Sequence, residues 1–376
     1  MRTLTIISHT EHYKKTDGNI VGLGSTITEI NHLLGVFDAI IHVAMLHNTP
    51  APLSALPYVS NKITFIALPA VGGTSLRDKL AIVFKAPEIL KTIKKAIDQT
   101  DYFQFRAPTG IGVYVIPYLI LFCTKKGWFK YAGNWKQHNA PLAYSFQRWL
   151  LKKQKRTVTI NGRWPDQPNH CLTFENPCLT EDEISQGQTI MRNKDLTKQA
   201  ISFCFVGRLE EAKGLDLIIE TFKKLSSEEK LKVKTVHIVG NGKAKQEYKN
   251  KVLDSGIDFK FHGFLSRAAV HDIYKKSHVI LLPSASEGFP KVIAEAMNYG
   301  CIPIVSDISS LGHYIKNNEN GFLLKQLNVS SLKNCISAIF ILKPHEYLNI
   351  KTTSLEFIEQ FSYSYYNKHL LNEILI

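Results

Sequence analysis

The sequence has 376 residues, of which 44% are hydrophobic and 21% charged, and at roughly 150 residues per domain this predicts two folded domains and excludes a disordered chain. The formal net charge is +14, which favours anionic partners such as phosphorylated ligands, nucleic acid or anionic lipid. No apolar run reaches the length of about 18 to 20 residues that crosses a bilayer, and the longest one, 112–123, is interrupted by Pro117.

In chain order, the first half reads as strands and helices with irregular spacing. The start, TLTIIS, predicts a strand at 3–8 and lacks the charged segment and apolar run of a secretory leader. The glycine-bearing stretch 16–25 predicts a loop that leads into a helix at 27–34. Further strands are expected at 39–46, 62–68 and 102–108, and helices at 87–98 and 112–121.

The stretch from Tyr102 to Trp164 contains no Asp or Glu, while Lys, Arg and aromatic residues alternate in it, as in YSFQRWLLKKQKR. For its central segment, 125–156, three interpretations remain open. Bulky apolar residues mixed with basic ones favour contact with an anionic membrane surface. A core helix with a solvated lysine face explains the same pattern, and charge alone is also typical of nucleic-acid binding.

Six cysteines are scattered through the chain without a CxxC pair, so no zinc site is expected. Several lie in strand-like runs. They predict buried free thiols in a reducing cytosol. Their positions are 123, 171, 178, 204, 301 and 335.

The polar, aperiodic stretch 180–199 predicts the linker between the two domains. The linker places one domain at 1–180 and the other at 198–358. In the second domain strands and amphipathic helices alternate regularly, which predicts a parallel sheet with helices on both faces. The strands are expected at 201–207, 235–240, 259–263, 278–283 and 302–306.

Two doubly wound domains joined by a linker predict a deep cleft between them. Ligands of such sheets bind beyond the carboxyl ends of the strands, so the loops after each strand are the places to inspect. The loop GRLEEAKG, residues 207–214, combines glycines with Arg208 and Lys213. Glycines let a ligand approach the backbone, and the two cations suit a diphosphate, although an ordinary surface loop has the same composition.

The stretch SEGFPKVIAEAM, residues 286–297, places Glu287 before a helix and Glu295 within it. Pro290 suits the first helical position, so the helix is expected to begin near 289–290 with its free N–H groups and positive dipole end available to a phosphate. Carboxylates accept hydrogen bonds from hydroxyls, so two of them beside an anion-binding turn fit a nucleotide sugar. A capped surface helix with a solvated face is the alternative.

These motifs, in order and spacing, resemble the retaining glycosyltransferases of family 4. The matching stretches are GRLEEAKG, VGNG, FHGFLS, LLPSASEGFPKVIAEAMNYGCIPIVSD and NGFLL, within about residues 200 to 325. The resemblance implies the GT-B fold, an α/β architecture of two Rossmann-like doubly wound domains facing across a cleft. It implies that 1–180 binds the acceptor, that 198–358 binds the nucleotide sugar, and that a final helix at 360–376 crosses back to the first domain.

The resemblance also assigns residues to the donor. Arg208 and Lys213 would hold the donor diphosphate and neutralise the leaving group, Glu295 would bind the ribose hydroxyls, and Glu287 would orient the sugar. The catalytic candidates are therefore Arg208, Lys213 and Glu287. The other residues implied at the donor are Gly207, Gly240, Gly242, His262, Gly263, Gly288 and Phe289.

The first domain matches the family less closely. Gly18 lies in the stretch that resembles the glycine loop after the first strand, where backbone approaches donor phosphate and acceptor. Where many relatives carry a histidine, this chain reads FRAPTG, so Arg106 is an acceptor-side candidate that either binds an anionic acceptor group or simply pairs within the cleft. His12 and Asp17 are near the first loop and are expected to serve turns or caps.

The function expected from these features is sugar transfer from a UDP- or GDP-sugar to a glycan or lipid-linked acceptor, in the biosynthesis of capsule, exopolysaccharide or lipopolysaccharide. No cofactor is required and no metal is expected, because the chain lacks a D-x-D motif. The protein is expected in the cytoplasm, peripheral on the inner membrane face, with no nucleic-acid partner. A sugar-nucleotide epimerase or phosphorylase on the same fold, and a basic nucleic-acid-binding protein, are the alternatives.

Overall fold

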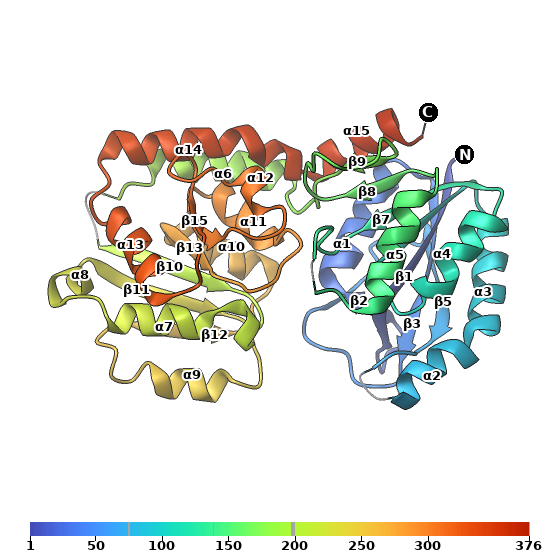
Figure 1. The fold of residues 1–376 in the computed structure, drawn as a ribbon, viewed down its shortest axis with the longest axis horizontal. Coiled ribbons are helices and arrows are strands. Elements are labelled where there is room, and N and C mark those ends of the chain that lie inside the picture. The colour runs from blue at the N-terminus through green and yellow to red at the C-terminus, as the bar shows by residue number, and fades with distance from the viewer. Residues whose placement is uncertain (74–75, 138, 197–199, 376) are drawn as a thin grey trace. The chain divides into compact units, whose positions relative to one another are not determined.

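The structure is a computed structural model that describes residues 1–73, 76–137, 139–196 and 200–375. It divides into unit 1, formed by Met1–Glu175 and Tyr366–Ile376, and unit 2, formed by Asn176–Tyr365 (Figure 1). The expected boundary between 180 and 198 therefore lies inside unit 2. The chain returns to unit 1 at Tyr366, within the helix expected at 360–376, whose last residue is outside the description.

Unit 1 is built on a largely parallel sheet. Its parallel strands lie in the order β5-β3-β1-β6-β7-β8-β9, which places the first strand in the middle. The expected strands at 3–8, 39–46, 62–68 and 102–108 are all present. The bounds are β1 Thr3–Lys14, β3 Ala39–His47, β5 Ile63–Pro69, β6 Tyr102–Ala107, β7 Lys126–Tyr131, β8 Val158–Ile160 and β9 Cys171–Thr173.

Helices cover both faces of this sheet because successive strand residues point to opposite sides. On β7, Trp128 packs in a cluster with Phe37 and Tyr366, while Phe129 packs with Ile93 and Val115 in another. The helices of unit 1 are α1 Gly24–His32, α2 Leu76–Phe84, α3 Ala86–Asp98, α4 Gly112–Leu121, α5 Leu142–Lys153 and α15 Tyr363–Glu373, with a 3-10 turn η1 at Leu33–Gly35.

The loop expected at 16–25 is wrong in part. Residues Ile20–Leu23 form β2, which pairs antiparallel with the end of β1 and also with β4, Ala55–Pro57. Strand β1 runs beyond residue 8 to Lys14, and the chain turns back at Gly18, which has φ +85°. The hairpin thus replaces most of the expected glycine loop.

Unit 2 has a fully parallel sheet in the order β12-β11-β10-β13-β14-β15. Because β11 and β12 extend to one side of β10 while β13, β14 and β15 extend to the other, the strand order reverses between β10 and β13. Ligands bind at such a reversal in doubly wound sheets. The strands are β10 Ile201–Val206, β11 Val233–Val239, β12 Phe259–Gly263, β13 Val279–Leu282, β14 Ile302–Ser306 and β15 Phe322–Leu324.

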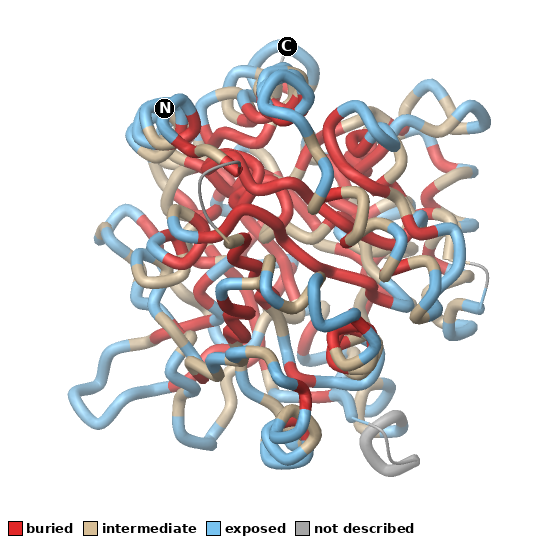
Figure 2. Tube along the Cα trace, turned by 90° about the vertical axis from the view of Figure 1, so that its left-hand side faces the viewer, coloured by how far each residue is buried: buried red, intermediate tan, exposed pale blue. Residues whose placement is uncertain are grey.

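Helices also cover both faces of the second sheet, and one continuous core joins them to the strands. Figure 2 shows buried segments along the strands and exposed segments in the outer loops and helices. The helices are α6 Glu181–Asn193, α7 Leu215–Lys223, α8 Ser227–Leu231, α9 Lys245–Lys251, α10 Arg267–Lys276, α11 Lys291–Asn298, α12 Leu311–Tyr314, α13 Val329–Ile339 and α14 Pro344–Ile358, with 3-10 turns η2 Glu211–Lys213 and η3 Glu359–Phe361.

The interdomain linker expected at 180–199 is wrong. The stretch forms helix α6, which begins with a capping box in which the Thr180 side chain accepts from the Glu183 amide and the Glu183 side chain accepts from the Thr180 amide. Gly187 and Met191 are buried on its inner face. Residues 197–199 of the expected linker lie outside the description.

Among the described residues, no helix combines the length and apolarity needed to cross a bilayer. All six cysteines are free thiols. Four of them are buried, whereas Cys123 and Cys335 are only partly buried.

Candidate functional site

The candidate donor site lies at the reversal of strand order in unit 2. The loop after β10 carries Arg208 and Lys213, and the loop after β13 carries Glu287. A backbone hydrogen bond joins the two loops: the Ala285 amide donates to the Ala212 carbonyl at 2.8 Å. The two loops that the sequence predicts as ligand-binding loops therefore lie next to each other.

Glycines allow the loops at this edge to approach one another. A Cβ on Gly240 would lie 1.8 Å from the Gly207 carbonyl oxygen, and one on Gly242 would lie 2.2 Å from the Leu209 carbonyl oxygen. The Gly240 amide donates to the Gly263 carbonyl at 2.8 Å, so the ends of β10, β11 and β12 form one continuous backbone surface. Side chains at these positions would separate the strand ends.

Lys213 and Glu287 form the central ion pair of the site. The Lys213 Nζ lies 2.6 Å from the Glu287 Oε1, and the two side chains are 19% and 10% exposed. The Ser284 hydroxyl donates to the same Oε1 at 2.8 Å. Lys213 is fixed by its neighbour Gly214, whose φ of +77° and close approach to Pro283 exclude a side chain.

Arg208 lies in the same loop but is far more accessible. Its side chain is 74% exposed and its Nη1 lies 3.1 Å from the Glu210 Oε1. An exposed guanidinium held by one surface carboxylate can turn toward an anion at little cost, because such a pair contributes about 1 kcal/mol or less. The loop thus offers one fixed cation, Lys213, and one movable cation, Arg208.

The helix expected after the Gly-Phe-Pro turn is present as α11. It begins at Lys291, with Pro290 as the N-cap residue, one position later than the proline at the first helical position that the sequence predicts. Phe289 is buried and stacks on Phe361 with ring centroids 4.7 Å apart. The Ser310 hydroxyl donates to the Gly288 carbonyl at 3.3 Å. Phe289 therefore holds the turn by packing, which leaves the backbone of 288–289 as the part suited to a ligand.

Glu295 forms its hydrogen bonds with residues other than Lys213 and Glu287. It is 8% exposed, and its Oε1 accepts from the Arg267 Nη1 at 2.9 Å. The Tyr274 hydroxyl lies 3.4 Å from its Oε2. Arg267 was missed by the sequence analysis.

His262 lies at the end of β12 and its Nε2 is 2.9 Å from the Nδ1 of His237 on β11. Burial, aided by the nearby Lys260, lowers the pKa of His262. Burial and the charge of His262 lower the pKa of His237 to about 4. Both rings are therefore neutral near pH 7 and can exchange hydrogen bonds with a neutral, planar ligand such as a nucleobase.

In unit 1, the two acceptor-side candidates have different surroundings. Gly18 lies at the hairpin turn with nothing within 4 Å of a Cβ placed there. The Arg106 Nη2 donates to the Glu29 Oε1 at 2.9 Å, and the Lys130 Nζ lies 2.5 Å from the same oxygen. Arg106 therefore has an ion-pair partner within its own unit.

His12 is fully buried rather than placed at a surface turn. Its Nε2 lies 2.9 Å from the Tyr58 hydroxyl, which is 2.6 Å from the Nδ1 of His42. The predicted turn role of His12 is therefore wrong. Asp17 does serve a turn, since it accepts from the amide of Asn19 at 2.9 Å.

His9 is a second residue that the sequence analysis missed. The strand order of unit 1 reverses between β1 and β6, and His9 lies on β1 near this reversal. Its Nε2 is 2.6 Å from the Val71 carbonyl oxygen, and Cβ atoms on Gly72 or Gly110 would lie 3.2 and 3.3 Å from its ring. Two glycine-bearing loops thus border a half-buried imidazole, a signal that a search for glycines and histidines just after strands could have found.

The basic–aromatic segment 125–156, of which residue 138 lies outside the description, is only partly a cationic surface. Lys130 is buried, Arg148 donates to the carbonyls of Asn134, Trp135 and Gln137, and Arg156 donates to those of Cys123 and Lys125. Of these three bases, Arg148 lies on α5, Lys130 lies on β7 and Arg156 lies between α5 and β8, so they do not form the solvated lysine face of a core helix. Lys126, Lys153 and Lys155 are exposed.

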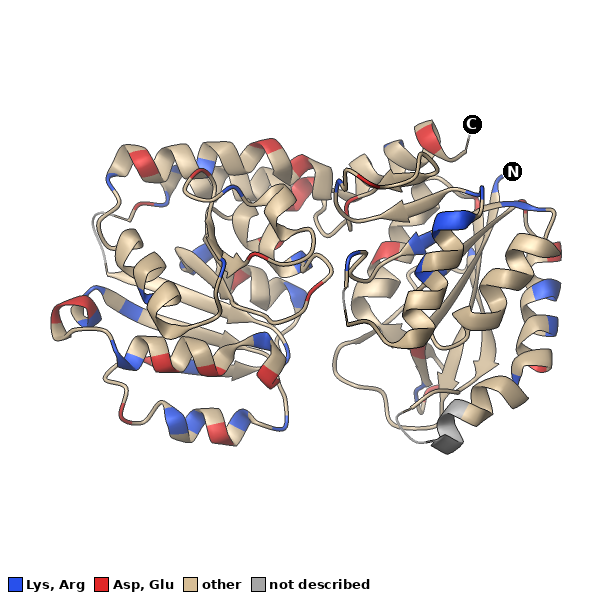
Figure 3. Ribbon diagram, viewed as in Figure 1, with Lys and Arg blue, Asp and Glu red and all other residues tan. Residues whose placement is uncertain are grey.

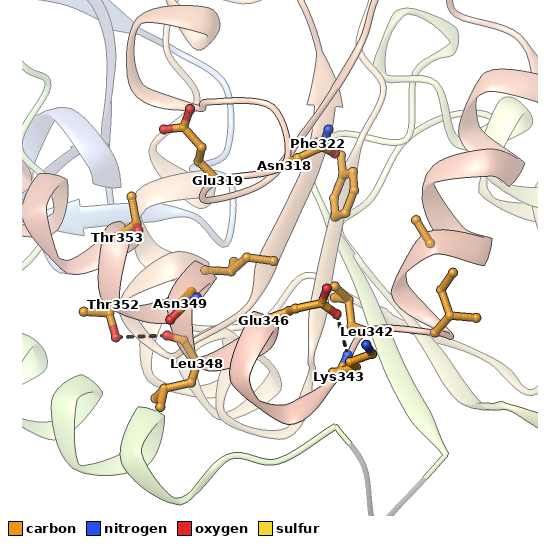
Figure 4. Close-up of a pocket in the computed structure, with 13 residues that line it drawn as sticks. Asn318, Glu319, Phe322, Leu342, Lys343, Glu346, Leu348, Asn349, Thr352 and Thr353 are labelled. Atoms are coloured by element: carbon orange, nitrogen blue, oxygen red, sulfur yellow. Dashed lines mark hydrogen bonds between the residues drawn. The ribbon is translucent and has the colours of Figure 1, made fainter.

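A hollow of about 840 Å³ lies elsewhere in unit 2, between β15, α13 and α14 (Figure 4). Two local hydrogen bonds lie in its lining: the Lys343 amide donates to Glu346 at 2.7 Å, and the Thr352 hydroxyl donates to the Leu348 carbonyl at 2.9 Å. None of the predicted site residues lines it.

Comparison with known families finds a match within unit 2. Residues 187–350 match the family described as Glycosyl transferases group 1. The match contains the loops of Lys213 and Glu287 and also Arg267.

Two curated relatives each match less than half of the chain. An uncharacterized glycosyltransferase of Haemophilus influenzae is 29% identical over 174 residues, which cover 46% of this chain and 48% of that protein. A UDP-Gal:alpha-D-GlcNAc-diphosphoundecaprenol alpha-1,3-galactosyltransferase of Escherichia coli is 29% identical over 154 residues, covering 41% and 40%. The aligned regions thus span less than half of each of these relatives.

Solved structures resemble the whole chain. Anabaena HepE in complex with UDP and glucose matches with a TM-score of 0.67 at 14% identity, covering 99% of this chain and 98% of the other. Sucrose-phosphate synthase from Thermosynechococcus elongatus matches with a TM-score of 0.72 at 15% identity, covering 99% and 98%. With two Rossmann-like units, the predicted GT-B fold is confirmed.

Proposed function

We propose that the protein transfers a sugar from a nucleotide-diphosphate sugar, a UDP- or GDP-sugar, to a glycan or lipid-linked acceptor. The observation that carries this proposal is the Lys213–Glu287 pair at the strand-order reversal of unit 2, bordered by glycine-bearing strand ends. Cation, carboxylate and open backbone at one sheet edge match the three chemical parts of such a donor: diphosphate, sugar hydroxyls and nucleotide.

The leaving diphosphate gains negative charge as the sugar–phosphate bond breaks. Lys213 is the group best placed to take that charge, because its ammonium is largely buried and is paired with Glu287. Arg208 adds a second cation, and the N-terminus of α11 adds the positive end of a helix dipole. The reaction then needs no covalent change in the protein to stabilise its leaving group.

Glu287 has two tasks in this proposal. Before the donor binds, it holds Lys213 in the site with Ser284 as a second support. Once the diphosphate takes over Lys213, the carboxylate is free to accept hydrogen bonds from sugar hydroxyls. Retention of configuration at the anomeric carbon is proposed from the resemblance to family 4, and NMR of the product anomer tests it.

The acceptor is proposed to bind to unit 1, with His9 among the contacts. A lipid-linked acceptor is favoured because two relatives have names that specify such acceptors: the Escherichia coli galactosyltransferase, and a Campylobacter jejuni enzyme named as acting on a diNAcBac-PP-undecaprenol glycan. We therefore propose a role in cell-surface polysaccharide biosynthesis at the inner face of the membrane. Screening undecaprenyl-diphosphate sugars as acceptors tests this part separately.

The direct test of the donor proposal is binding of UDP and GDP, measured by calorimetry on the full chain. We expect one of the two to bind, and Lys213→Met to weaken it at least about tenfold, since a hydrogen bond to a charged group contributes about 1.5 to 3 kcal/mol. Lys223→Met, which removes a surface cation from α7, is the matched control. Equal binding by the wild type and Lys213→Met would contradict the proposed site, and turnover without an acceptor would instead indicate an epimerase.

Membrane contact is proposed through the exposed face of α5. Leu142, Phe146, Trp149 and Lys153 follow one another at helical spacing, and the three apolar side chains are 89%, 42% and 56% exposed. The Phe146 and Trp149 rings stack at 6.1 Å. Figure 3 shows basic residues at the C-terminal end of α5. An apolar stripe that ends in lysines suits the interface of an anionic bilayer.

Vesicle flotation tests this surface. We expect the protein to float with vesicles rich in phosphatidylglycerol and not with phosphatidylcholine alone, and Phe146→Ser with Trp149→Ser to abolish flotation. Lys249→Glu, on an exposed position of α9 in unit 2, should leave it unchanged, whereas Lys153→Glu should weaken it. Equal flotation with both lipids would contradict the electrostatic part of the proposal.

A further inference from the structure

Arg267 occupies a position where its own helix does not favour it. It is the first residue of α10, directly after the N-cap residue Ser266, and the first turn of α10 has no acidic residue. A cation at this end of a helix opposes the helix dipole, at a cost of a few tenths to about 1 kcal/mol. Such a local conflict directs attention to what the side chain contacts elsewhere.

The guanidinium is anchored on one side to α6. Its Nε donates to the Glu183 Oε1 at 2.8 Å and its Nη2 donates to the Glu183 Oε2 at 2.7 Å, which is the bidentate arrangement that only arginine provides. The same Nη2 donates to the Cys178 carbonyl. Glu183 is itself held by the Thr180 amide at 2.9 Å through the capping box. The guanidinium of Arg267 is therefore bound to a carboxylate whose own position is fixed.

On its other side the guanidinium reaches Glu295 on α11. Its Nη1 donates to the Oε1 of that carboxylate at 2.9 Å, while the Tyr274 hydroxyl lies at the longer distance of 3.4 Å from Oε2. Oε1 is thus engaged, whereas Oε2 keeps most of its capacity to accept a hydrogen bond. Since Glu295 is 8% exposed, its buried carboxylate needs hydrogen-bond partners, and Arg267 supplies the shorter of these two contacts.

The charges of this group agree with the geometry. Burial works to raise the pKa of Glu183, but the hydrogen bonds and charge of Arg267 lower it below the ordinary value. Burial lowers the pKa of His271, the neighbour on α10, and the charge of Arg267 lowers it further, so His271 is neutral near pH 7. Arg267 therefore supplies the cation between the two carboxylates.

We propose that Arg267 is a positioning residue for donor recognition, which holds the Glu295 carboxylate turned so that Oε2 accepts a ribose hydroxyl. The inference rests on the proposed function together with the ribose-binding role that the family resemblance implies for Glu295. It goes further because it assigns the orientation of Glu295 to a residue that itself need not touch the donor. A purely structural role, in which Arg267 only fastens α6 to α11, predicts a different set of affinities.

The experiment compares three ligands on the full chain by calorimetry: the nucleoside diphosphate that binds, UDP or GDP, its 2′,3′-dideoxy analogue, and inorganic pyrophosphate. The wild type should prefer the ribose form by about tenfold or more, the contribution of a hydrogen bond to a charged group. In Arg267→Met this preference should fall to less than about twofold, while pyrophosphate affinity stays within about twofold of the wild type, by the same relation between affinity and free energy. Lys276→Met, an exposed lysine in the last turn of the same helix, should behave as the wild type.

Arg267→Lys keeps the charge without the fork and serves if the methionine variant does not fold. It should lose most of the ribose preference, because an ammonium cannot hold Glu183 bidentately. An undiminished preference in either folded variant overturns the inference, and so does an equal weakening of all three ligands, which is the signature of a structural role. A wild type that binds none of the ligands overturns the proposed function itself.

Discussion

Gly214 gives the sharpest test of how the donor site is built. It has φ +77°, and a Cβ added there would lie 2.1 Å from the carbonyl oxygen and 2.9 Å from the carbonyl carbon of Pro283. Gly214→Ala therefore forces the loop of Lys213 away from the loop of Glu287. Ordinary contact begins near 3.4 Å, so the backbone atoms must separate by more than 1 Å, a shift of about the size that misplaces a substrate-binding group.

The cost can be estimated from the structure. The left-handed conformation costs an alanine about 1 to 2 kcal/mol, and overpacking against backbone adds about 1 to 3 kcal/mol. Loss of glycine freedom in the unfolded chain returns about 0.4 to 1 kcal/mol. We therefore expect Gly214→Ala to lower the free energy of unfolding of unit 2 by about 1 to 4.5 kcal/mol.

Gly256→Ala is the matched control because Gly256 has φ +69° in the same unit but meets only the flexible Lys230 side chain, at 3.6 Å. It should cost about 1 kcal/mol or less. Hydrogen exchange of amides in β10 and β13 measures the difference, and tryptophan fluorescence should stay unchanged, since all four tryptophans lie in unit 1. If Gly214→Ala costs no more than Gly256→Ala, the close approach to Pro283 does not shape the site.

Three further predictions concern charge. Arg208→Ala should lower turnover roughly 100- to 1,000-fold without changing stability, because the exposed guanidinium acts on the leaving group rather than on the fold; unchanged turnover in steady-state kinetics would remove it from the mechanism. Glu29→Gln should destabilise unit 1 by about 3 to 5 kcal/mol, because it removes the carboxylate that pairs with both Arg106 and the buried Lys130. Arg106→Gln should cost less, because Lys130 still neutralises Glu29. Urea unfolding followed by tryptophan fluorescence compares the two variants. Burial lowers the pKa of His12 from 6.5 to about 4, so below pH 6.5 the unfolded chain binds a proton that the folded unit does not, and unit 1 should lose about 2 kcal/mol of stability between pH 7 and pH 5; His12→Gln should make this dependence shallower, and an identical pH profile would contradict the assignment.

The strands and helices of unit 2 could be predicted well from the sequence, because each of them has a clear pattern of apolar residues within its own segment. Strands buried on both faces read as continuous apolar runs, as in 201–207 and 278–283, and the helices between them carry regular apolar stripes. The edge where ligands bind follows from parallel strands alone. For this reason the sequence alone predicts that the loops of Lys213 and Glu287 lie at the same edge of the sheet, where the two side chains form an ion pair.

The errors came where local signals are weak or where contacts are distant in sequence. Helix α6 was read as a linker because its outer face is polar, although Thr180 and Glu183 have the spacing of a capping box. Strand β7, KGWFKY, was not predicted, because its lysines were interpreted as part of a basic–aromatic surface. Arg267 binds partners 84 and 28 positions away, and no periodicity records such contacts.

The connection between the units has a practical consequence. Unit 2 is one uninterrupted segment, and near its two ends Leu179 and Ser362 form a parallel β-bridge. Within unit 1, the rings of Phe174 and Tyr366, which flank the excursion, are 5.6 Å apart. Unit 2 is thus inserted into unit 1 as one segment whose two ends lie close together, so a short glycine-serine linker offers a route to make either unit separately, and to exchange unit 2 for the corresponding unit of a related chain.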